Sequence, residues 1–258
     1  AQNLTDYDIE ALANYMHGIN RCMSRNGNIR KDQMLGKAYG IGVGPGDPKL
    51  LTVKATEILE QLKIVFYPSF GKNSIALDIA RSHIRTDAKL IEMNIPLFPN
   101  EAKVAAYQNF ANQIKEYLNK QVDVGVLCEG DPLFFGSFIT IRDLLKESHQ
   151  VKVVSGISSI MSAFVHLDDF MGQGDDSISI ITAGTDEFLI RDKISKSNTT
   201  IIIKVAKHLK KIKKIATDSG LLETSMYISQ IDQAHQYSDR LSMISDEVIE
   251  YFSIIIIK

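Results

Sequence analysis

Three glycine-rich stretches hold the residues of this chain that are best suited to bind a ligand. Each follows a short apolar run, and they are residues 40–52 (GIGVGPGDPKLLT), 127–137 (LCEGDPLFFGS) and 154–159 (VSGISS). Ligands of open α/β sheets bind at the carboxyl ends of the strands. Two stretches that share Gly-Asp-Pro at such ends therefore predict a common binding site, although each alone is also an ordinary turn. The serine pair of the third stretch is equally well explained by capping of a helix.

The first stretch does not match the loops that bind nucleotide phosphates. Pro45 interrupts the G-x-G-x-x-G pattern, and Tyr67-Pro68 follows the second apolar run where an acidic residue would be needed. Asp47, beside the glycines, disfavours a phosphate and suits a cationic or hydroxylated ligand. These features argue against nucleotide phosphate binding and against a nicotinamide-dependent oxidoreductase.

Strands and helices that alternate regularly must position the three stretches. Apolar runs predict strands at 38–43, 64–67, 122–128 and 151–154, and helical spacing of apolar residues predicts helices at 50–62, 101–118, 135–145 and 158–166. Strand-then-helix units of this length predict a parallel sheet that is covered on both faces.

A polar, glycine-rich segment at residues 168–176 (DDFMGQGDD) predicts a domain boundary. We therefore expect an N-terminal α/β domain at 37–168 and a C-terminal α/β domain at 169–258. Strands are expected in the second domain at 178–182, 200–205, 225–229, 241–244 and 252–257. Only two or three helices separate these strands, which predicts a mixed sheet.

The first 36 residues differ from the rest and predict a helical extension of unclear role. Thr5 is a possible N-cap with Asp8 three residues later, and Ile9, Leu12 and Met16 share one helical face. The polar stretch that follows contains no further apolar pattern before residue 34.

The composition predicts a protein with a hydrophobic core and little net charge. Of 258 residues, 45% are hydrophobic, and 29 Lys and Arg oppose 31 Asp and Glu, which gives a net charge of -2. This balance argues against bulk electrostatic binding to nucleic acid or to an anionic membrane. Cys22 and Cys128 are too few for a disulfide framework and lack metal-ligand spacing, so we expect a cytoplasmic location and no metal site. No apolar run approaches the roughly 20 residues that span a bilayer.

The three stretches, in this order and at these separations, resemble the tetrapyrrole (corrin and porphyrin) methylases. Three further features resemble the branch of precorrin-2 C20-methyltransferases: Tyr67-Pro68, Gly174-Asp175-Asp176 and Tyr251-Phe252-Ser253. The resemblance covers roughly residues 37–258. It implies two α/β domains with the active cleft between them, which is the fold of the class III S-adenosylmethionine methyltransferases. It also implies a homodimer.

The resemblance implies S-adenosylmethionine as the cofactor and places seven residues beside it. Six lie in the second and third stretches and one in the first, namely Pro45, Glu129, Gly130, Asp131, Phe134, Ser158 and Ser159. A sulfonium cofactor is cationic at sulfur, so carbonyls, hydroxyls and a carboxylate suit it better than a phosphate cradle.

Several positions depart from the family pattern. Ser155 replaces a usual proline, Glu129 a usual small residue, and Pro68 the aspartate that uroporphyrinogen methylases carry after the second strand. The last departure argues against the uroporphyrinogen reaction and leaves the catalytic base unassigned. The basic helix around residues 207–214 is best explained as a solvated face.

The activity implied by the resemblance is C20 methylation of precorrin-2, or of cobalt-precorrin-2, in cobalamin (vitamin B12) biosynthesis. The small-molecule tetrapyrrole substrate carries eight carboxylates, so cations should border the cleft. The candidates by loop position are Lys49, Lys72, Arg81 and Arg85. Two alternatives stay open. They are a methylase of the same fold that acts on another position or substrate, and a non-catalytic binding protein that kept the fold.

Overall fold

The computed structural model describes residues 35–69, 74–96, 101–246 and 250–258. The part of the chain from Leu35 to Lys258 forms one compact unit. The predicted N-terminal extension, residues 1–36, lies almost entirely outside the described residues. Among the helices that are described, none combines the length and the apolar character that crossing a membrane would require.

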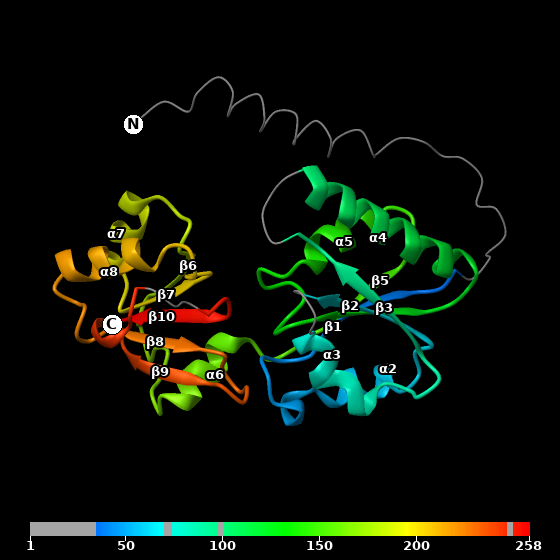
Figure 1. Cartoon of the computed structure of the whole chain (residues 1–258), viewed down its shortest axis with the longest axis horizontal. Coiled ribbons are helices and arrows are strands. Elements are labelled where there is room, and N and C mark those ends of the chain that lie inside the picture. Colours follow the sequence, from blue (N-terminus) through cyan, green and yellow to red (C-terminus); the bar gives the residue numbers. More distant parts are fainter. Residues whose placement is uncertain (1–34, 70–73, 97–100, 247–249) are drawn as a thin grey trace, which may run out of the picture. The chain divides into compact units, whose positions relative to one another are not determined.

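The first half of the compact unit is built on a parallel five-stranded sheet (Figure 1). Its strands are β1 (Ala38–Gly42), β2 (Ile64–Ser69), β3 (Lys89–Asn94), β4 (Val124–Cys128) and β5 (Val151–Val154). They are arranged in the order β3-β2-β4-β1-β5, and every neighbouring pair is parallel. All residues of β4 are buried, as expected for a central parallel strand covered on both faces.

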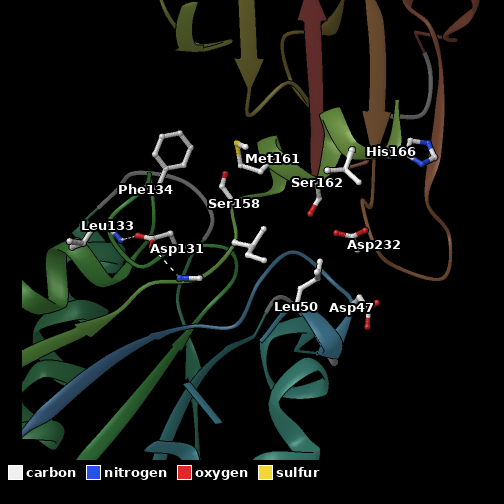
Figure 2. Close-up of a pocket in the computed structure, with 13 residues that line it drawn as sticks. Asp47, Leu50, Asp131, Leu133, Phe134, Ser158, Met161, Ser162, His166 and Asp232 are labelled. Carbon is white, nitrogen blue, oxygen red and sulfur yellow. Dashed lines mark hydrogen bonds between the residues drawn. The ribbon is translucent and has the colours of Figure 1, made fainter. Parts of the chain in front are cut away.

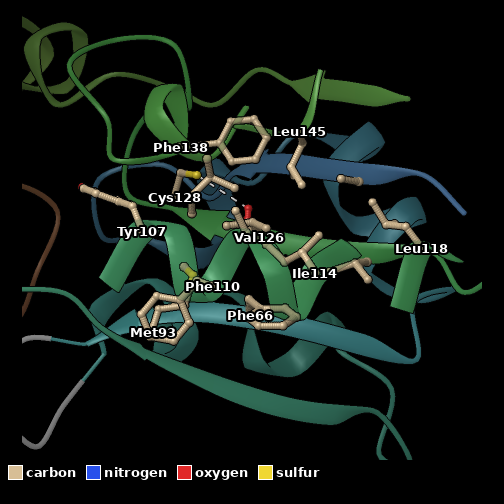
Figure 3. Close-up of a cluster of buried hydrophobic side chains, with 14 of the residues drawn as sticks. Phe66, Met93, Tyr107, Phe110, Ile114, Leu118, Val126, Cys128, Phe138 and Leu145 are labelled. Atoms are coloured by element: carbon tan, nitrogen blue, oxygen red, sulfur yellow. Dashed lines mark hydrogen bonds between the residues drawn. The ribbon is translucent and has the colours of Figure 1, made fainter. Parts of the chain in front are cut away.

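Helices cover both faces of this sheet because successive side chains of a strand point to opposite sides. On one face Phe66 and Val126 pack with Ile114 of α4 (Glu101–Asn119) and Phe138 of α5 (Phe138–Leu145) (Figure 3). On the other face, the sheet residues pack with α2 (Val53–Leu59) and α3 (Ile75–Ala80). These sheet residues are Ile41, Val65, Leu127 and Val154. The predicted parallel, doubly covered sheet is therefore confirmed.

The second half contains a mixed five-stranded sheet, as the sequence predicts. Its strands are β6 (Ile178–Thr182), β7 (Thr199–Ile203), β8 (Met226–Ser229), β9 (Tyr237–Arg240) and β10 (Ser253–Ile257), in the order β6-β7-β10-β8-β9. Only β6 and β7 pair in parallel, and the other three pairs are antiparallel. The helices α7 (Glu187–Lys196) and α8 (Leu209–Asp218) pack on one face.

The opposite face of the second sheet is covered by α6 (Ser159–His166). Ile160 and Phe164 of this helix share a core cluster with Ile201, Ile228 and Ile254 of the sheet. This helix, assigned from the sequence to residues 37–168, therefore contributes to the core of the second half. The boundary between residues 168 and 169 stays a prediction.

Three features of the sequence-based assignment differ from the structure. The predicted strand at 241–244 is wrong, because Leu241–Met243 is a 3-10 turn and the strand β9 lies just before it. Leu241 is fully buried in the core and supplies the apolar signal, whereas β9 is polar and is stabilised by pairing with β8. The elements β3 and α3 were not predicted. In β3, an edge strand, only Met93 is buried, so it lacks a continuous apolar run.

Candidate functional site

The loops after β1 and β4 lie side by side, as the repeated Gly-Asp-Pro pattern predicts. The amide of Gly130 donates to the carbonyl of Gly44 at 2.9 Å, and the two residues form an antiparallel bridge. Both glycines adopt left-handed backbone conformations, with φ of 82° at Gly44 and 65° at Gly130. Residues that have a Cβ atom are strained in this backbone conformation, so glycine is required where the two loops pair.

The carboxylate of Asp131 ties the loop after β4 to the loop after β5. Its Oδ1 accepts a hydrogen bond from the amide of Leu133 at 2.9 Å, and its Oδ2 accepts one from the amide of Gly156 at 3.1 Å. Gly156 fits only without a side chain, since a Cβ there would lie 2.1 Å from the carbonyl oxygen of Gly130. The three stretches singled out in the sequence are therefore held together.

A cavity of about 930 Å³ opens at these strand ends (Figure 2). The loops after β1, β4 and β5, the helix α6 and the loop after β8 all contribute to it. Its lining consists of Asp47, Leu50, Asp131, Leu133, Phe134, Gly156, Ile157, Ser158, Met161, Ser162, Val165, His166 and Asp232. The position at the carboxyl ends of a parallel sheet is where ligands of such folds bind.

Three of the predicted site residues line this cavity: Asp131, Phe134 and Ser158. Ser158 is also the N-cap of α6, and its hydroxyl accepts a hydrogen bond from the amide of Ile160 at 3.3 Å. The capping interpretation is therefore confirmed, and it is compatible with a place in the lining. Ser159 is the first residue of α6 and is not part of the lining.

The remaining three predicted residues are not part of the cavity lining. Pro45 is buried, and its carbonyl accepts a hydrogen bond from Nε2 of Gln233 in the second half at 3.2 Å. Gly130 forms the bridge to Gly44. Glu129 precedes it at the end of β4 and is half-buried. A ligand-binding role for these three residues stays a prediction.

Glu129 has an unusual environment. Its Oε1 atom is buried and lacks a hydrogen-bond partner among the described residues. Burial raises the pKa of this carboxyl to about 7, and backbone hydrogen bonds, including one from Ala76, lower it only in part. Burial, followed by the nearby charge of Glu129, also raises the pKa of Tyr251. Glu129 is thus a carboxyl group that exchanges its proton near neutral pH.

The lining is acidic, which restricts the chemistry of its ligand. Asp47, Asp131 and Asp232 contribute carboxylates, and none of the described lining residues is a lysine or arginine. Such a set fits a cationic, hydroxylated ligand and does not fit a phosphate. Within the described part of the chain, no group of three or more His, Cys, Asp or Glu side chains is placed to hold a metal ion.

The sequence predicts a cleft between the two domains but names no residue of the second half that lines it. Asp232 follows β8, and its Oδ2 atom is buried without a partner among the described residues. Met161 and Val165, one helical turn apart on α6, are 50% and 80% exposed despite being apolar. Their spacing resembles an ordinary core face, so only the structure separates them from the residues that pack against the sheet.

Of the four cations predicted to border the cleft, two form ion pairs, one is exposed and one lies outside the described residues. Arg85 forms a bidentate pair with Asp87, with both contacts at 2.7 Å, and Arg81 contacts an aspartate three residues earlier. Lys49 lies exposed in a 3-10 turn, and Lys72 is outside the described residues. Their contact with substrate stays a prediction.

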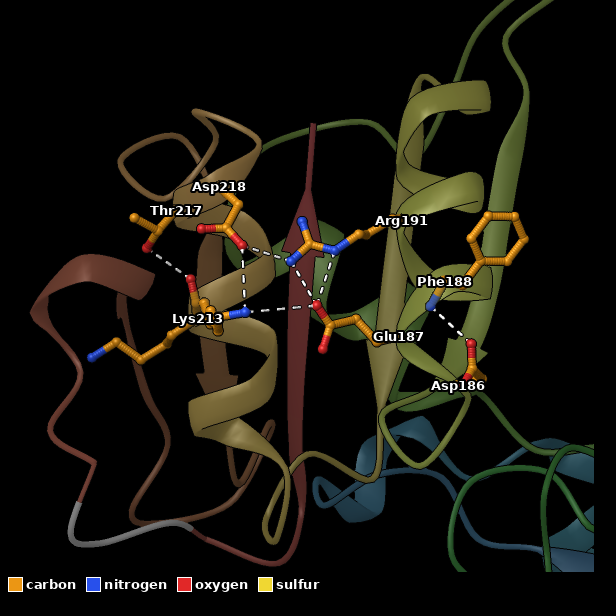
Figure 4. A network of polar contacts seen from close by, with 8 residues as sticks. Asp186, Glu187, Phe188, Arg191, Lys213, Thr217 and Asp218 are labelled. Atoms are coloured by element: carbon orange, nitrogen blue, oxygen red, sulfur yellow. Dashed lines mark hydrogen bonds and ion pairs between the residues drawn. The ribbon is translucent and has the colours of Figure 1, made fainter.

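The basic helix α8 is engaged in local contacts (Figure 4). Arg191 of α7 contacts Glu187 at 2.7 Å and Asp218 of α8 at 2.6 Å, and Lys213 donates to the carbonyl of Ile244 at 2.7 Å. Lys214 is 68% exposed, as a solvated face predicts, whereas Lys213 is only 21% exposed. Exposed ion pairs of this kind contribute little stability.

The fold and the cavity define a class of protein, and comparison with known proteins identifies it. The family model of the tetrapyrrole (corrin/porphyrin) methylases matches residues 37–236, and the chain belongs to this family. The resemblance seen in the sequence is therefore confirmed.

Two relatives match over nearly their whole length. A probable cobalt-precorrin-2 C(20)-methyltransferase from Methanocaldococcus jannaschii is 30% identical over 232 residues, which cover 88% of this chain and 98% of the relative. A precorrin-2 C(20)-methyltransferase from a Sinorhizobium species is 26% identical over 236 residues, which cover 86% and 95%.

Solved structures confirm the fold. A cobalt precorrin-4 methyltransferase has a TM-score of 0.68 at 20% identity and covers 86% of this chain and 94% of its own. Uroporphyrin-III C-methyl transferase from Thermus thermophilus, complexed with S-adenosylhomocysteine, has a TM-score of 0.62 at 17% identity, with 86% and 97% covered. The expected fold of two α/β domains is thus confirmed.

Proposed function

We propose that this chain is an S-adenosylmethionine-dependent methyltransferase that methylates C20 of precorrin-2 or cobalt-precorrin-2 in cobalamin biosynthesis. The observation that carries the proposal is similarity over nearly the full length to two relatives named for this reaction. The family membership and the acidic cavity at the strand ends support it independently.

The cavity suits the proposed cofactor in both size and charge. Its volume of about 930 Å³ is that of a site for a drug-sized ligand, for which the typical range is about 300–1,000 Å³. When bound, S-adenosylmethionine supplies an electrophilic methyl group on a positively charged sulfur. The carboxylates of Asp47, Asp131 and Asp232 give the cavity the negative charge that such a ligand requires.

The contribution of the protein residues is mainly to position and enclose the reactants. Asp131 fixes the loops after β4 and β5 relative to each other, and Phe134 and Met161 add apolar surface that excludes water. The nucleophile is the enamine-like meso carbon of the substrate, so no protein nucleophile is required. Holding this carbon in line with the methyl group supplies several kcal/mol. The base for the lost proton stays unassigned, because Glu129, although it titrates near neutrality, is not part of the cavity lining.

The proposal extends to a homodimer in the cytoplasm. The dimer is implied by the family resemblance. The location is supported by the two cysteines of the sequence, of which Cys128 is buried and free.

Incubation with labelled S-adenosylmethionine and either metal-free or cobalt-loaded precorrin-2 tests the activity. We expect transfer of one methyl group to at least one of the two substrates, with carbon NMR locating it at C20. A methyl group at another carbon would favour a methylase of a different position. No transfer to either substrate, by protein that binds S-adenosylhomocysteine, would favour a non-catalytic binding protein.

A further inference from the structure

Phe135 and Lys204 form a contact between the two halves. Phe135 belongs to the loop after β4, and Lys204 directly follows β7 of the second sheet. The Nζ atom of Lys204 lies 5.7 Å from the centroid of the Phe135 ring, which is within the range of a cation–π interaction. Lys204 is exposed, and its ammonium group has no carboxylate partner among the described residues. Its positive charge is therefore not neutralised by this part of the chain.

Both residues hold unfavourable backbone conformations. The φ angle is 54° at Phe135 and 58° at Lys204, in the left-handed region that residues with a Cβ atom rarely adopt. Such strain persists where the surrounding structure enforces it, and it concentrates at binding and active sites. Two strained residues that meet from opposite halves therefore point to a surface that binds a ligand.

A second lysine lies near Lys204. Lys103 belongs to the first turn of α4 and is half-buried. Burial lowers the pKa of its ammonium group, and the nearby positive charge of Lys204 lowers it further. Two cations that are held near each other repel, and an anion bound beside both of them offsets this repulsion. The two lysines, one from each half, therefore favour an anionic ligand. Neither is among the four cations predicted from the sequence to border the cleft.

Apolar side chains connect this pair of lysines to the rim of the cavity. Leu133 and Phe134 line the cavity on the side away from Asp47 (Figure 2). The rings of Phe134 and Phe135 meet edge to face, with their centroids 5.0 Å apart. Leu133 is 48% exposed and Phe135 is 44% exposed, so this side of the rim presents apolar surface. It fits a ligand that is apolar over its face and anionic at its edge.

We propose that Lys204, together with Lys103, binds a carboxylate side chain of the tetrapyrrole substrate while the macrocycle packs against Phe135. The substrate must bring its C20 carbon to the methyl group of a cofactor held in the cavity, so the macrocycle has to lie at the rim. Its carboxylates complement the two lysines, and its apolar face complements Leu133 and Phe135. The inference rests on the proposed function and adds two residues that determine substrate specificity.

Titration of Lys204→Gln and of the wild type with precorrin-2 and with cobalt-precorrin-2 tests this role. Absorbance of the macrocycle reports binding, and S-adenosylhomocysteine is present throughout. We expect Lys204→Gln to bind the substrate about 10-fold more weakly, as for loss of a contact between two charged groups. Lys103→Gln should also weaken binding, and Lys204→Arg, which keeps the charge, should restore most of the affinity. In turnover, KM should rise more than kcat falls, because the lysine contacts a side chain that is remote from the reacting carbon.

A substrate derivative with its carboxylates converted to amides separates charge recognition from packing. The wild type should bind this amide more weakly than the acid, whereas Lys204→Gln and the wild type should bind the amide equally. Lys193→Gln is the matched control. Lys193 is also exposed but lies at the other end of β7, where its carbonyl accepts a hydrogen bond from the hydroxyl of Thr200 at 3.4 Å. This control should bind both ligands like the wild type.

Two results would overturn the inference and leave the proposed function standing, provided that the wild type methylates C20. One is equal affinity of Lys204→Gln and the wild type for the acid. The other is an equal loss of affinity for the acid and for the amide, which would show that Lys204 acts through packing and not through charge. If the wild type bound S-adenosylhomocysteine but neither form of precorrin-2, the proposed function would be overturned together with this inference.

Discussion

Glu129 shows how position alone changes the chemistry of a single side chain. The residue directly follows the fully buried strand β4, and its backbone leads into the loop that lines the cavity. Burial of one carboxylate oxygen without a partner raises its pKa to about 7, from an ordinary value of 4.5. In the folded protein, the uncharged form of Glu129 is therefore favoured over a range of pH in which the same group has already lost its proton in the unfolded chain.

The stability of the protein should depend on pH through Glu129. Between pH 4.5 and 7 the folded state retains a proton that the unfolded state releases, so stability is lost as pH rises through this window. Glutamine has no such proton. As pH rises from 4.5 to 8, the unfolding free energy of Glu129→Gln should therefore increase by about 1–3 kcal/mol relative to that of the wild type.

Urea denaturation at the two pH values measures this gain. Glu57→Gln on the exposed surface of α2 is the control for replacing a glutamate elsewhere. If the difference in unfolding free energy between Glu129→Gln and the wild type were the same at pH 4.5 and pH 8, this result would contradict the raised pKa of Glu129.

At the same scale, the sequence identifies those site residues that lie in local motifs. Asp131 and Ser158 are found because each lies one or a few residues beyond a strand that is readable as an apolar run. Asp232 also follows a strand that is readable in the sequence, β8, but no glycine-rich motif marks it, and it enters the cavity only because the second half packs beside the first sheet. Residues placed by tertiary packing are those that sequence patterns miss.

At the scale of elements, glycines set how closely the three strand-end loops approach one another. A Cβ on Gly156 would lie 2.1 Å from the carbonyl oxygen of Gly130 and 2.7 Å from the carbonyl carbon of Gly42. Both neighbours are backbone atoms, which cannot rotate away. The loop after β5 would have to move, and its amide would then lose the hydrogen bond to Asp131.

Gly156→Ala should therefore destabilise the protein and weaken cofactor binding together. Overpacking and a lost hydrogen bond of this kind destabilise by about 1–3 kcal/mol each. Chemical denaturation and titration with S-adenosylhomocysteine measure the two effects. Gly184→Ala is the control, because its Cβ would meet only an ordinary contact at 3.7 Å. If both variants had the stability and the ligand affinity of the wild type, this result would contradict the close approach of the loops.

The elements that the sequence predicted well are those with one clear periodicity. The helix predicted at 101–118 is observed as Glu101–Asn119, because Phe110, Ile114 and Leu118 repeat at helical spacing on its buried face. The polar edge strand β9 has no comparable pattern, and pairing with β8 defines it. Edge strands depend on a neighbour that is distant in sequence, so their position follows from the fold as a whole.

For the whole molecule, each half has its own buried clusters, and the cavity draws on both. The clusters of the first sheet contain side chains from β1 to β5, and those of the second contain side chains from β6, β7, β8 and β10 and from α6. Direct polar contact between the halves includes the hydrogen bond from Gln233 to the carbonyl of Pro45. A ligand in the cavity adds contacts to both halves at once.

Binding of S-adenosylhomocysteine should therefore slow amide hydrogen exchange in both halves. A ligand at 100 times its dissociation constant stabilises the folded state by about 2.7 kcal/mol, and local openings that break its contacts are suppressed most. We expect protection at residues 130–134 and 156–162 and also at 230–233, measured by mass spectrometry with and without ligand. The exposed face of α8, which is outside the cavity lining, is the internal control and should change least. Protection confined to the loops of the first sheet would contradict a site shared by the two halves, because the contact to Asp232 would then be missing.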